Sequence, residues 1–510
     1  MAKSNAARTV VIDMGSNSFR LVVYDSLGER WWRHSDEIYD VVRIGAGLGE
    51  TGRLSEERIE LALEVMEVYA HFCAASGIAP SNVRAVATSA IRDAANGQEL
   101  VERVKRHTKL DVRVLSEAEE AYYAYLAAIN TTTLSDGVVL DLGGGSLQLV
   151  HVGDRQALAR NSWPLGTVRT TERFFARGAS GKQRAALRDH VLRKLERLSW
   201  REEAAGTIVG MGGTVRNLAS AAATVPERAG IGVHGFVLAR DALEELIVRL
   251  ARASEEERRQ MPGIKPERAS IILAGAIVVA AVLDAFEAPG LEVTEAGLRE
   301  GVFFSTYLAP ADPPLFADVR EASVLNLANQ YQADLTHPWH VARTARQLWS
   351  SLAKAGATPE TTLDADGLLW AAAMLHDIGM AIDYDDHHKH SRYLVLAAGL
   401  PGYSQREQAL IAQTVRYHRK GSPELGVLAG VCEPGDERLL KALAAVLALA
   451  EVLDRGRDGT IDVDGLHGEN GSFELELDIH RRGDEILARW GAERQSDAFR
   501  RAFGKGLTIG

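Results

Sequence analysis

The stretch that decides the fold is residues 11–24, VIDMGSNSFRLVVY, because it returns later in the chain as residues 139–152, VLDLGGGSLQLVHV. Aligned without gaps, the two stretches share Val, Asp, Gly, Ser, Leu and Val at matching places. Each has a short apolar strand, an aspartate, a glycine turn with serine and a second apolar strand. That pattern predicts a β-hairpin with a polar tip. Two copies predict two similar lobes that face each other.

Strand and helix patterns alternate around each hairpin. Strands are expected at 83–88, 111–115 and 207–210, and amphipathic helices at 55–75, 97–107, 117–129, 166–177 and 182–198, with another helix from Thr214. The apolar run 271–283 is shorter than the ~20 residues that cross a bilayer, so we expect a buried helix there. This half of the chain is typical of α/β architecture with mixed sheets.

The pattern changes after residue 308. Residues 309–314, APADPP, have the composition of a linker. Helices are then expected at 319–330, 337–354, 366–375, 405–417 and 437–453, strands at 461–466 and 473–479, and a charged helix at 484–503 that closes the chain. We therefore predict domains at 1–130, 131–310 and 311–510.

Composition limits the classes of function. The 510 residues are 46% hydrophobic and 25% charged, as in ordinary globular proteins, and the net charge is -11. An acidic chain of this kind argues against a nucleic-acid polymer as partner, because a basic face supplies that affinity. Two distant cysteines and a polar start without a signal-peptide core favour a reducing, cytoplasmic location and no membrane segment.

The glycine turns suit phosphate binding. A glycine-rich turn lets backbone N–H groups approach phosphate oxygens, and Asp13 and Asp141 stand just before two such turns. Carboxylates there can hold magnesium together with phosphate oxygens. Residues 211–214, MGGT, add a third turn that opens a helix, where anions are favoured. One such hairpin alone is usually a plain turn, but the duplication and the third turn favour a phosphate-binding cleft.

Six motifs resemble the exopolyphosphatase / guanosine pentaphosphate phosphohydrolase (Ppx/GppA) family, which is related to actin, sugar kinases and heat-shock chaperone ATPases. They are DMGSNSFRL at 13–21, ATSAIRDAAN at 87–96, LSEAEEAYYAYLA at 115–127, DLGGGS at 141–146, PLGTVRTTERF at 164–174 and GMGGTVRNLA at 210–219. They occur in family order over residues 8–310. The resemblance implies two ribonuclease-H-like lobes and a magnesium-dependent hydrolase that removes terminal phosphate from inorganic polyphosphate, from pppGpp, or from both.

The resemblance also implies roles for single residues. Glu120 would be the general base that takes a proton from the attacking water, and Asp141, helped by Asp13, would hold Mg2+. Without the resemblance, acids at a helix start are explained equally well by the helix dipole. The phosphate-binding residues would be Asn17, Ser18, Arg92, Gly143, Gly144, Gly145, Ser146, Gly212, Gly213 and Thr214. For Arg92, the alternative is an exposed side chain at a helix start that pairs with Asp93.

Two positions depart from the family pattern. Gln148 stands where the family often has an acid, and Tyr122 stands where it often has an arginine. Because these changes remove a negative and a positive charge, a protein that senses polyphosphate or an alarmone without hydrolysing it is an alternative. A kinase is a further alternative, since the superfamily includes ATP-dependent phosphotransferases.

The third predicted domain contains LHDIG at 375–379. The order His337, His376, Asp377 and Asp454 resembles the HD superfamily of metal-dependent phosphohydrolases, whose imidazole and carboxylate ligands suit a second divalent metal. Further candidate ligands are His387, His388, His390 and His418. This HD-like domain would be either the catalyst itself or a helical extension without metal. The basic cluster 416–420 is either a solvated face or part of a polyanion channel. The family implies a homodimer.

Overall fold

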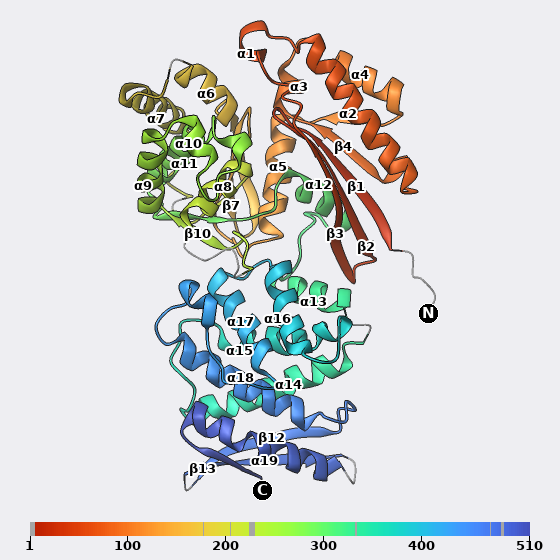
Figure 1. The fold of residues 1–510 in the computed structure, drawn as a ribbon, viewed down its shortest axis with the longest axis vertical. Coiled ribbons are helices and arrows are strands. Elements are labelled where there is room, and N and C mark those ends of the chain that lie inside the picture. The colour runs from red at the N-terminus through yellow and green to blue at the C-terminus, as the bar shows by residue number, and fades with distance from the viewer. Residues whose placement is uncertain are drawn as a thin grey trace. The chain divides into compact units, whose positions relative to one another are not determined.

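The computed structural model describes residues 6–176, 178–204, 206–223, 230–331, 334–469, 471–480 and 484–509. Two compact units are present: Met1–Ala223 with Val233–Val319, and Thr224–Gly232 with Arg320–Gly510. The first unit contains two mixed sheets and the second is mostly helical (Figure 1). The three predicted domain ranges are not tested by this division and stay a prediction.

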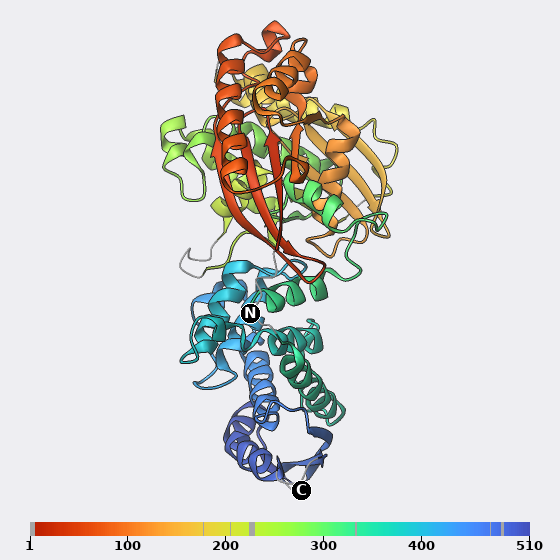
Figure 2. The same ribbon diagram turned by 90° about the vertical axis from the view of Figure 1, so that its right-hand side faces the viewer.

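The first sheet has the strand order β3-β2-β1-β4-β5. Its strands are β1 (Ala7–Met14), β2 (Phe19–Leu27), β3 (Trp31–Asp40), β4 (Val83–Ala87) and β5 (Val112–Val114). Alternate β1 residues face opposite sides: Val10 and Ile12 pack against α2 (Glu56–Ala75) and α4 (Gly97–Thr108), whereas Val11 faces α12 (Leu298–Tyr307). Helices therefore cover both faces (Figures 1 and 2).

The second sheet repeats this plan with the order β10-β11-β9-β6-β7-β8. Its strands are β6 (Gly137–Leu142), β7 (Leu147–Gly153), β8 (Gln156–Trp163), β9 (Ile208–Met211), β10 (Phe236–Ala239) and β11 (Gly290–Val293). One face packs on α7 (Gly181–Leu195), α8 (Gly213–Ala222), α9 (Arg240–Arg252) and α11 (Ile272–Ala285). The other face packs on α5 (Glu117–Ile129). The apolar run of the sequence is thus the buried helix α11, as predicted.

Both predicted hairpins are present with the same geometry. Asp13 pairs with Arg20 across β1 and β2, and Asp141 pairs with Gln148 across β6 and β7. Each turn closes in the same way, with Gly15 N–H donating to Ser18 O at 3.1 Å and Gly143 N–H donating to Ser146 O at 3.0 Å. The internal repeat is therefore a structural repeat that places one carboxylate at the same point of each sheet.

The second unit is a helical core with a small sheet. Its helices are α13 (Val319–Tyr331), α14 (Thr336–Lys354), α15 (Ala365–Leu375), α16 (His387–Ala398), α17 (Gln405–Tyr417) and α18 (Asp436–Leu453). The strands β12 (Ile461–Glu469), β13 (Ser472–Ile479) and β14 (Gly506–Ile509) lie with α19 (Asp484–Phe503) at one end of this unit (Figures 1 and 2). The prediction that the charged helix closes the chain is wrong, because β14 follows it and pairs with β13.

Other elements differ from the predictions in ways that their sequences explain. The edge strands β3 and β8 were not predicted, since they are polar and mostly accessible and lack a clear apolar alternation. Arg92 lies in the short helix α3 (Ser89–Asp93), which was not among the predicted helices. The remaining short helices are α1 (Leu48–Thr51), α6 (Thr167–Phe175) and α10 (Glu255–Arg259).

Helices α5 and α12 approach each other closely at a glycine. A Cβ atom added to Gly301 of α12 would lie 1.9 Å from the carbonyl oxygen of Tyr123 in α5. Only glycine fits there without moving one backbone away from the other. This contact fixes the depth of α5, whose first turn carries Glu120, under the second sheet.

We expect Gly301→Ala to lower the free energy of unfolding of the first unit by about 1–3 kcal/mol, because the methyl group forces the two helices apart. Differential scanning calorimetry of the full chain measures this. The matched control is Gly49→Ala, since a Cβ atom at Gly49 meets nothing within 4 Å. Equal transitions for both variants would contradict the close approach of α5 and α12.

Candidate functional site

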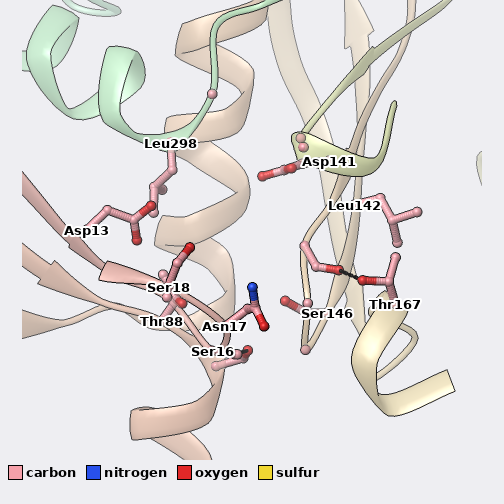
Figure 3. A pocket seen from close by; sticks show the side chains of 18 of the residues that line it. Asp13, Ser16, Asn17, Ser18, Thr88, Asp141, Leu142, Ser146, Thr167 and Leu298 are labelled. Carbon is pink, nitrogen blue, oxygen red and sulfur yellow. Dashed lines mark hydrogen bonds between the residues drawn. The ribbon is translucent and has the colours of Figure 1, made fainter. Parts of the chain in front are cut away.

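A pocket in the first unit is lined by the turns of both hairpins. Asp13, Ser16, Asn17 and Ser18 from the first hairpin lie across it from Asp141 and Ser146 of the second (Figure 3). Gly143, Gly144, Gly145, Gly212 and Gly213 also line it. The structure therefore brings together most of the residues that the sequence proposed for phosphate binding.

Two predicted residues do not line this pocket. Arg92 lies beside it and binds Glu120, as described below, and Thr214 is fully buried with its Oγ1 3.5 Å from Arg268 Nη1. Direct phosphate contacts for these two side chains stay a prediction.

Glycines allow the two turns to meet. A Cβ atom on Gly145 would lie 2.2 Å from Ser89 Oγ and 3.1 Å from Ser16 Oγ, which are themselves 3.1 Å apart. A Cβ atom on Gly213 would lie 2.0 Å from Arg268 Nη2. Gly212 has φ 96°, a conformation that favours glycine. The glycine motifs thus make room for neighbouring side chains as well as for a ligand.

Glu120 is held at the edge of the pocket. The capping box of Ser116 and Glu119 begins α5, which places Glu120 in the first turn of the helix with its side chain buried. One carboxylate oxygen accepts a hydrogen bond from Arg92 Nη1 at 2.7 Å and the other from Ser146 Oγ at 3.2 Å. Burial raises the pKa of Glu120, although the bonds from Arg92 and Ser146 oppose this rise.

Gln148 continues this hydrogen-bond chain. Its Nε2 donates to Ser146 Oγ at 2.8 Å, which leaves the Ser146 hydroxyl proton for Glu120. Gln148 is almost fully buried. Gln148, which stands at the family's acidic position, therefore orients Ser146 by donating a hydrogen bond to its hydroxyl oxygen. An ionised carboxylate at this position could only accept a hydrogen bond. Tyr122, the other departure, is outside the pocket lining, and its ring lies tilted beside that of Tyr125, with 5.8 Å between the ring centroids.

Three carboxylates repel one another in this pocket. Burial, then the neighbouring Glu120 and Asp13, raise the pKa of Asp141 to about 7. Burial also raises the pKa of Asp13, partly offset by Arg299, whose Nη1 lies 3.6 Å from Asp13 Oδ2. A carboxylate pair facing a shared pocket with unrelieved repulsion is a donor set that suits a hard divalent cation such as Mg2+. The residues present therefore fit this ion.

The sequence did not identify the cationic side of the pocket. Arg20, Arg216, Arg268 and Arg299 all line it. Burial, then Arg299, lower the pKa of Arg216 to about 10, and burial also lowers the pKa of Arg268. These two guanidiniums thus lack sufficient counter-charge among the described residues. Arg20 and Arg216 stand inside recognised motifs, whereas Arg268 and Arg299 lie in no motif that could have signalled them.

The HD-like residues gather in the second unit. His337, His376 and Asp377 offer ligand atoms that lie within 4.8 Å of one another, and all three are buried. Asp454 belongs to no such group among the described residues; its Oδ2 accepts from His337 Nδ1 at 2.6 Å. Glu451, which the sequence analysis did not name, lies with its Oε2 3.0 Å from Nε2 of both His337 and His376.

The two duplicated α/β lobes, each with a glycine-turn hairpin at one shared pocket, give the first unit an actin-like fold. The chain belongs to the Ppx/GppA phosphatase family, whose model matches residues 36–309; the model of Ppx/GppA phosphatase domain III matches residues 319–486. The predicted family and the predicted fold class are thereby confirmed. The HD-like character of the second unit stays a prediction.

Solved structures agree with this assignment. A Ppx/GppA family member from Aquifex aeolicus is 32% identical, with a TM-score of 0.51 over 59% of this chain and 97% of that one. An exopolyphosphatase-like protein is 27% identical, with a TM-score of 0.52 over 58% and 97%. An exopolyphosphatase from Cytophaga hutchinsonii shares the fold at 22% identity, with a TM-score of 0.53 over 59% and 98%.

The raised pKa of Asp141 predicts a pH-dependent stability. The folded protein holds this proton up to about pH 7, whereas the ordinary value is 3.8, so the wild type loses stability as the pH rises between these values. We expect Asp141→Asn to escape this loss. In metal-free buffer its melting temperature relative to wild type should be higher at pH 8 than at pH 5, a difference worth more than about 1 kcal/mol.

Asp136→Asn is the control, because hydrogen bonds from Ser135 and from the Asp154 backbone lower the pKa of Asp136 and leave it ionised at both pH values. If the melting temperatures of wild type and Asp141→Asn differ by the same amount at pH 5 and at pH 8, the raised pKa is contradicted.

Proposed function

We propose that this chain hydrolyses the terminal phosphoanhydride bond of inorganic polyphosphate in the pocket of the first unit. The observation that carries the proposal is a pocket with an oriented carboxylate, Glu120, on one side and two poorly neutralised, half-buried guanidiniums, Arg216 and Arg268, among its lining residues. Membership of a phosphatase family and likeness to an exopolyphosphatase-like protein support a phosphate polymer as substrate.

The residues divide the work of phosphoryl transfer. Backbone N–H groups of the glycine turns and the guanidiniums of Arg216 and Arg268 bind the terminal phosphates and orient them. Glu120, ionised and aligned by Arg92 and Ser146, accepts a proton from water as the water oxygen bonds to the terminal phosphorus. The bond to the bridging oxygen breaks, and the shortened polymer leaves with that oxygen. Glu120 then returns its proton to solvent.

Asp13 and Asp141 are the residues that would hold Mg2+. When bound there, the ion would neutralise charge on the phosphate oxygens and on the two carboxylates. Asp13 also lies close to Arg299, so the arginine would neutralise part of its charge beside a bound ion. Asn17 and Ser18 point into the same pocket and would donate to phosphate oxygens (Figure 3).

Guanosine pentaphosphate is the alternative substrate, since its terminal phosphates present the same chemistry. A nonhydrolytic sensor is an alternative of a different class, and Gln148 is the observation that favours it, because a buried amide replaces a charge. Binding without phosphate release would identify the sensor. A kinase would instead phosphorylate an acceptor in a nucleotide-dependent way.

A second candidate function is phosphohydrolysis in the second unit, favoured by the grouping of His337, His376 and Asp377.

A cytoplasmic location and a homodimer are further proposals. None of the described helices combines the length and the apolar character needed to cross a membrane.

We expect Glu120→Gln to lower the rate of phosphate release from polyphosphate with Mg2+ by ~10²–10⁴-fold, because the amide cannot accept the proton. The matched control is Glu117→Gln, an exposed position in the same helical turn, which should keep the wild-type rate. Parallel assays with pppGpp decide between the two substrates.

The double variant His376→Ala/Asp377→Ala separates the two candidate sites. It should retain phosphate release if the reaction occurs in the first unit. Loss in the double variant alone would move the chemistry to the second unit, and binding without release by wild type would leave the sensor.

Arg268→Gln should raise the KM for polyphosphate by ~10–100-fold with a smaller effect on kcat, because a charge-assisted contact to the substrate contributes about 1.5–3 kcal/mol. Arg258→Gln is the control, since Arg258 is partly buried in the same unit but outside the pocket lining. An unchanged KM for Arg268→Gln would remove Arg268 from the binding site.

A further inference from the structure

Six buried side chains with metal-binding chemistry converge in the second unit. They come from helices far apart in the sequence: His337 in α14, His376 and Asp377 after α15, His387 in α16, His418 after α17 and Glu451 in α18. Each has less than a tenth of its surface exposed. Burial of six ionisable groups together is costly unless something binds them.

Backbone carbonyls fix the protonation of three of the histidines. His376 Nδ1 lies 2.6 Å from Ala373 O, His387 Nδ1 lies 2.9 Å from Tyr384 O, and His418 Nδ1 lies 2.7 Å from Val415 O. A carbonyl oxygen only accepts, so each Nδ1 carries the hydrogen, and in the neutral ring Nε2 keeps a free lone pair. This arrangement is the usual support for a metal-binding histidine.

The free lone pairs point at one another. His387 Nε2 and His418 Nε2 are 3.2 Å apart, and Asp377 Oδ1 is 3.2 Å from His387 Nε2. Two acceptor nitrogens and a carboxylate oxygen at these distances repel unless a cation lies among them. Asp377, His387 and His418 therefore form a second group, with ligand atoms within 4.8 Å of one another.

Asp377 belongs to both groups. Its Oδ1 is also 3.7 Å from His376 Nε2, while its Oδ2 is held by Arg457. One oxygen atom thus faces both sets of histidines, which is the position of a bridging ligand between two ions. Glu451 Oε2, 3.0 Å from the Nε2 atoms of His337 and His376, adds a fourth donor to the first group.

We propose that the second unit holds a pair of transition-metal cations bridged by Asp377, one bound by His337, His376 and Glu451 and the other by His387 and His418. This goes beyond the function proposed for the first unit, because it adds a separate centre. Asp454 accepts from His337 Nδ1 and so orients that ring without binding an ion.

The donors select the class of ion. Imidazole nitrogens mixed with carboxylates suit manganese, iron, cobalt or zinc, whereas Mg2+ prefers oxygen ligands alone. The first position has four donors and the second has three, so the second keeps room for water or for an anionic oxygen ligand. Arg419 Nη1 lies 3.3 Å from His387 Nδ1; because that Nδ1–H is donated to the Tyr384 carbonyl, the guanidinium makes no hydrogen bond with it and only adds positive charge at that side.

The test is a Co2+ titration of the full-length, chelator-treated protein in excess Mg2+. We expect about two Co2+ per chain, with visible absorption bands from imidazole coordination. His418→Ala should bind about one, and Asp377→Asn should bind neither ion tightly, because the bridge serves both. Absence of imidazole-type absorption bands in wild type would overturn the proposal without any variant.

Two control variants make the test specific. His388→Ala removes a buried histidine that neighbours His387 but belongs to neither group. Asp141→Asn removes one of the carboxylates that line the pocket of the first unit. Both should still bind two ions. The paired centre would be overturned if wild type bound only one Co2+ per chain or if Asp377→Asn still bound two. It would also be overturned if His388→Ala lost as much bound Co2+ as His418→Ala.

Discussion

The first unit depends on one constraint: two hairpin turns that follow carboxylates must approach each other closely, and glycines at the tip of the second turn make room for the side chains of the first. Gly145 leaves the space that Ser16 and Ser89 occupy, and Gly213 leaves the space of the Arg268 guanidinium. Gly301 does the same at the backbone of α5. Asp13 is the last but one residue of β1, and Asp141 has the same place in β6. The close approach of the two turns therefore brings both carboxylates to one pocket.

Charge balance is the consequence of that approach. Three carboxylates gather around one pocket, and burial raises the pKa of each. Arg92 and Arg299 neutralise part of this charge, whereas Arg216 and Arg268 remain poorly neutralised. A site with both unsatisfied anions and unsatisfied cations favours a ligand that carries both, such as a phosphate chain with its divalent ion.

The second unit solves a similar problem with different donors. Three of its histidines, His376, His387 and His418, are each fixed by the backbone carbonyl three residues earlier. Local backbone geometry thus orients these three rings, whereas Asp454 orients that of His337, and only the packing of the helices brings the ring nitrogens together. The sequence indicated His337, His376 and Asp377 through their order, but it did not distinguish His418 from His388 or His390.

The sequence by itself determined the two hairpins, the glycine turns, the start of α5 at Ser116 and the presence of Glu120 in its first turn, because these depend on neighbours a few residues away. Tertiary structure alone decided that Arg92 binds Glu120, that Arg268 and Arg299 reach the pocket, and that Glu451 replaces Asp454 beside His376. The two contact pairs join residues that are 28 and 75 positions apart, and Arg268 and Arg299 lie in no motif. These contacts depend on how whole helices and sheets pack, which no short stretch of the sequence predicts.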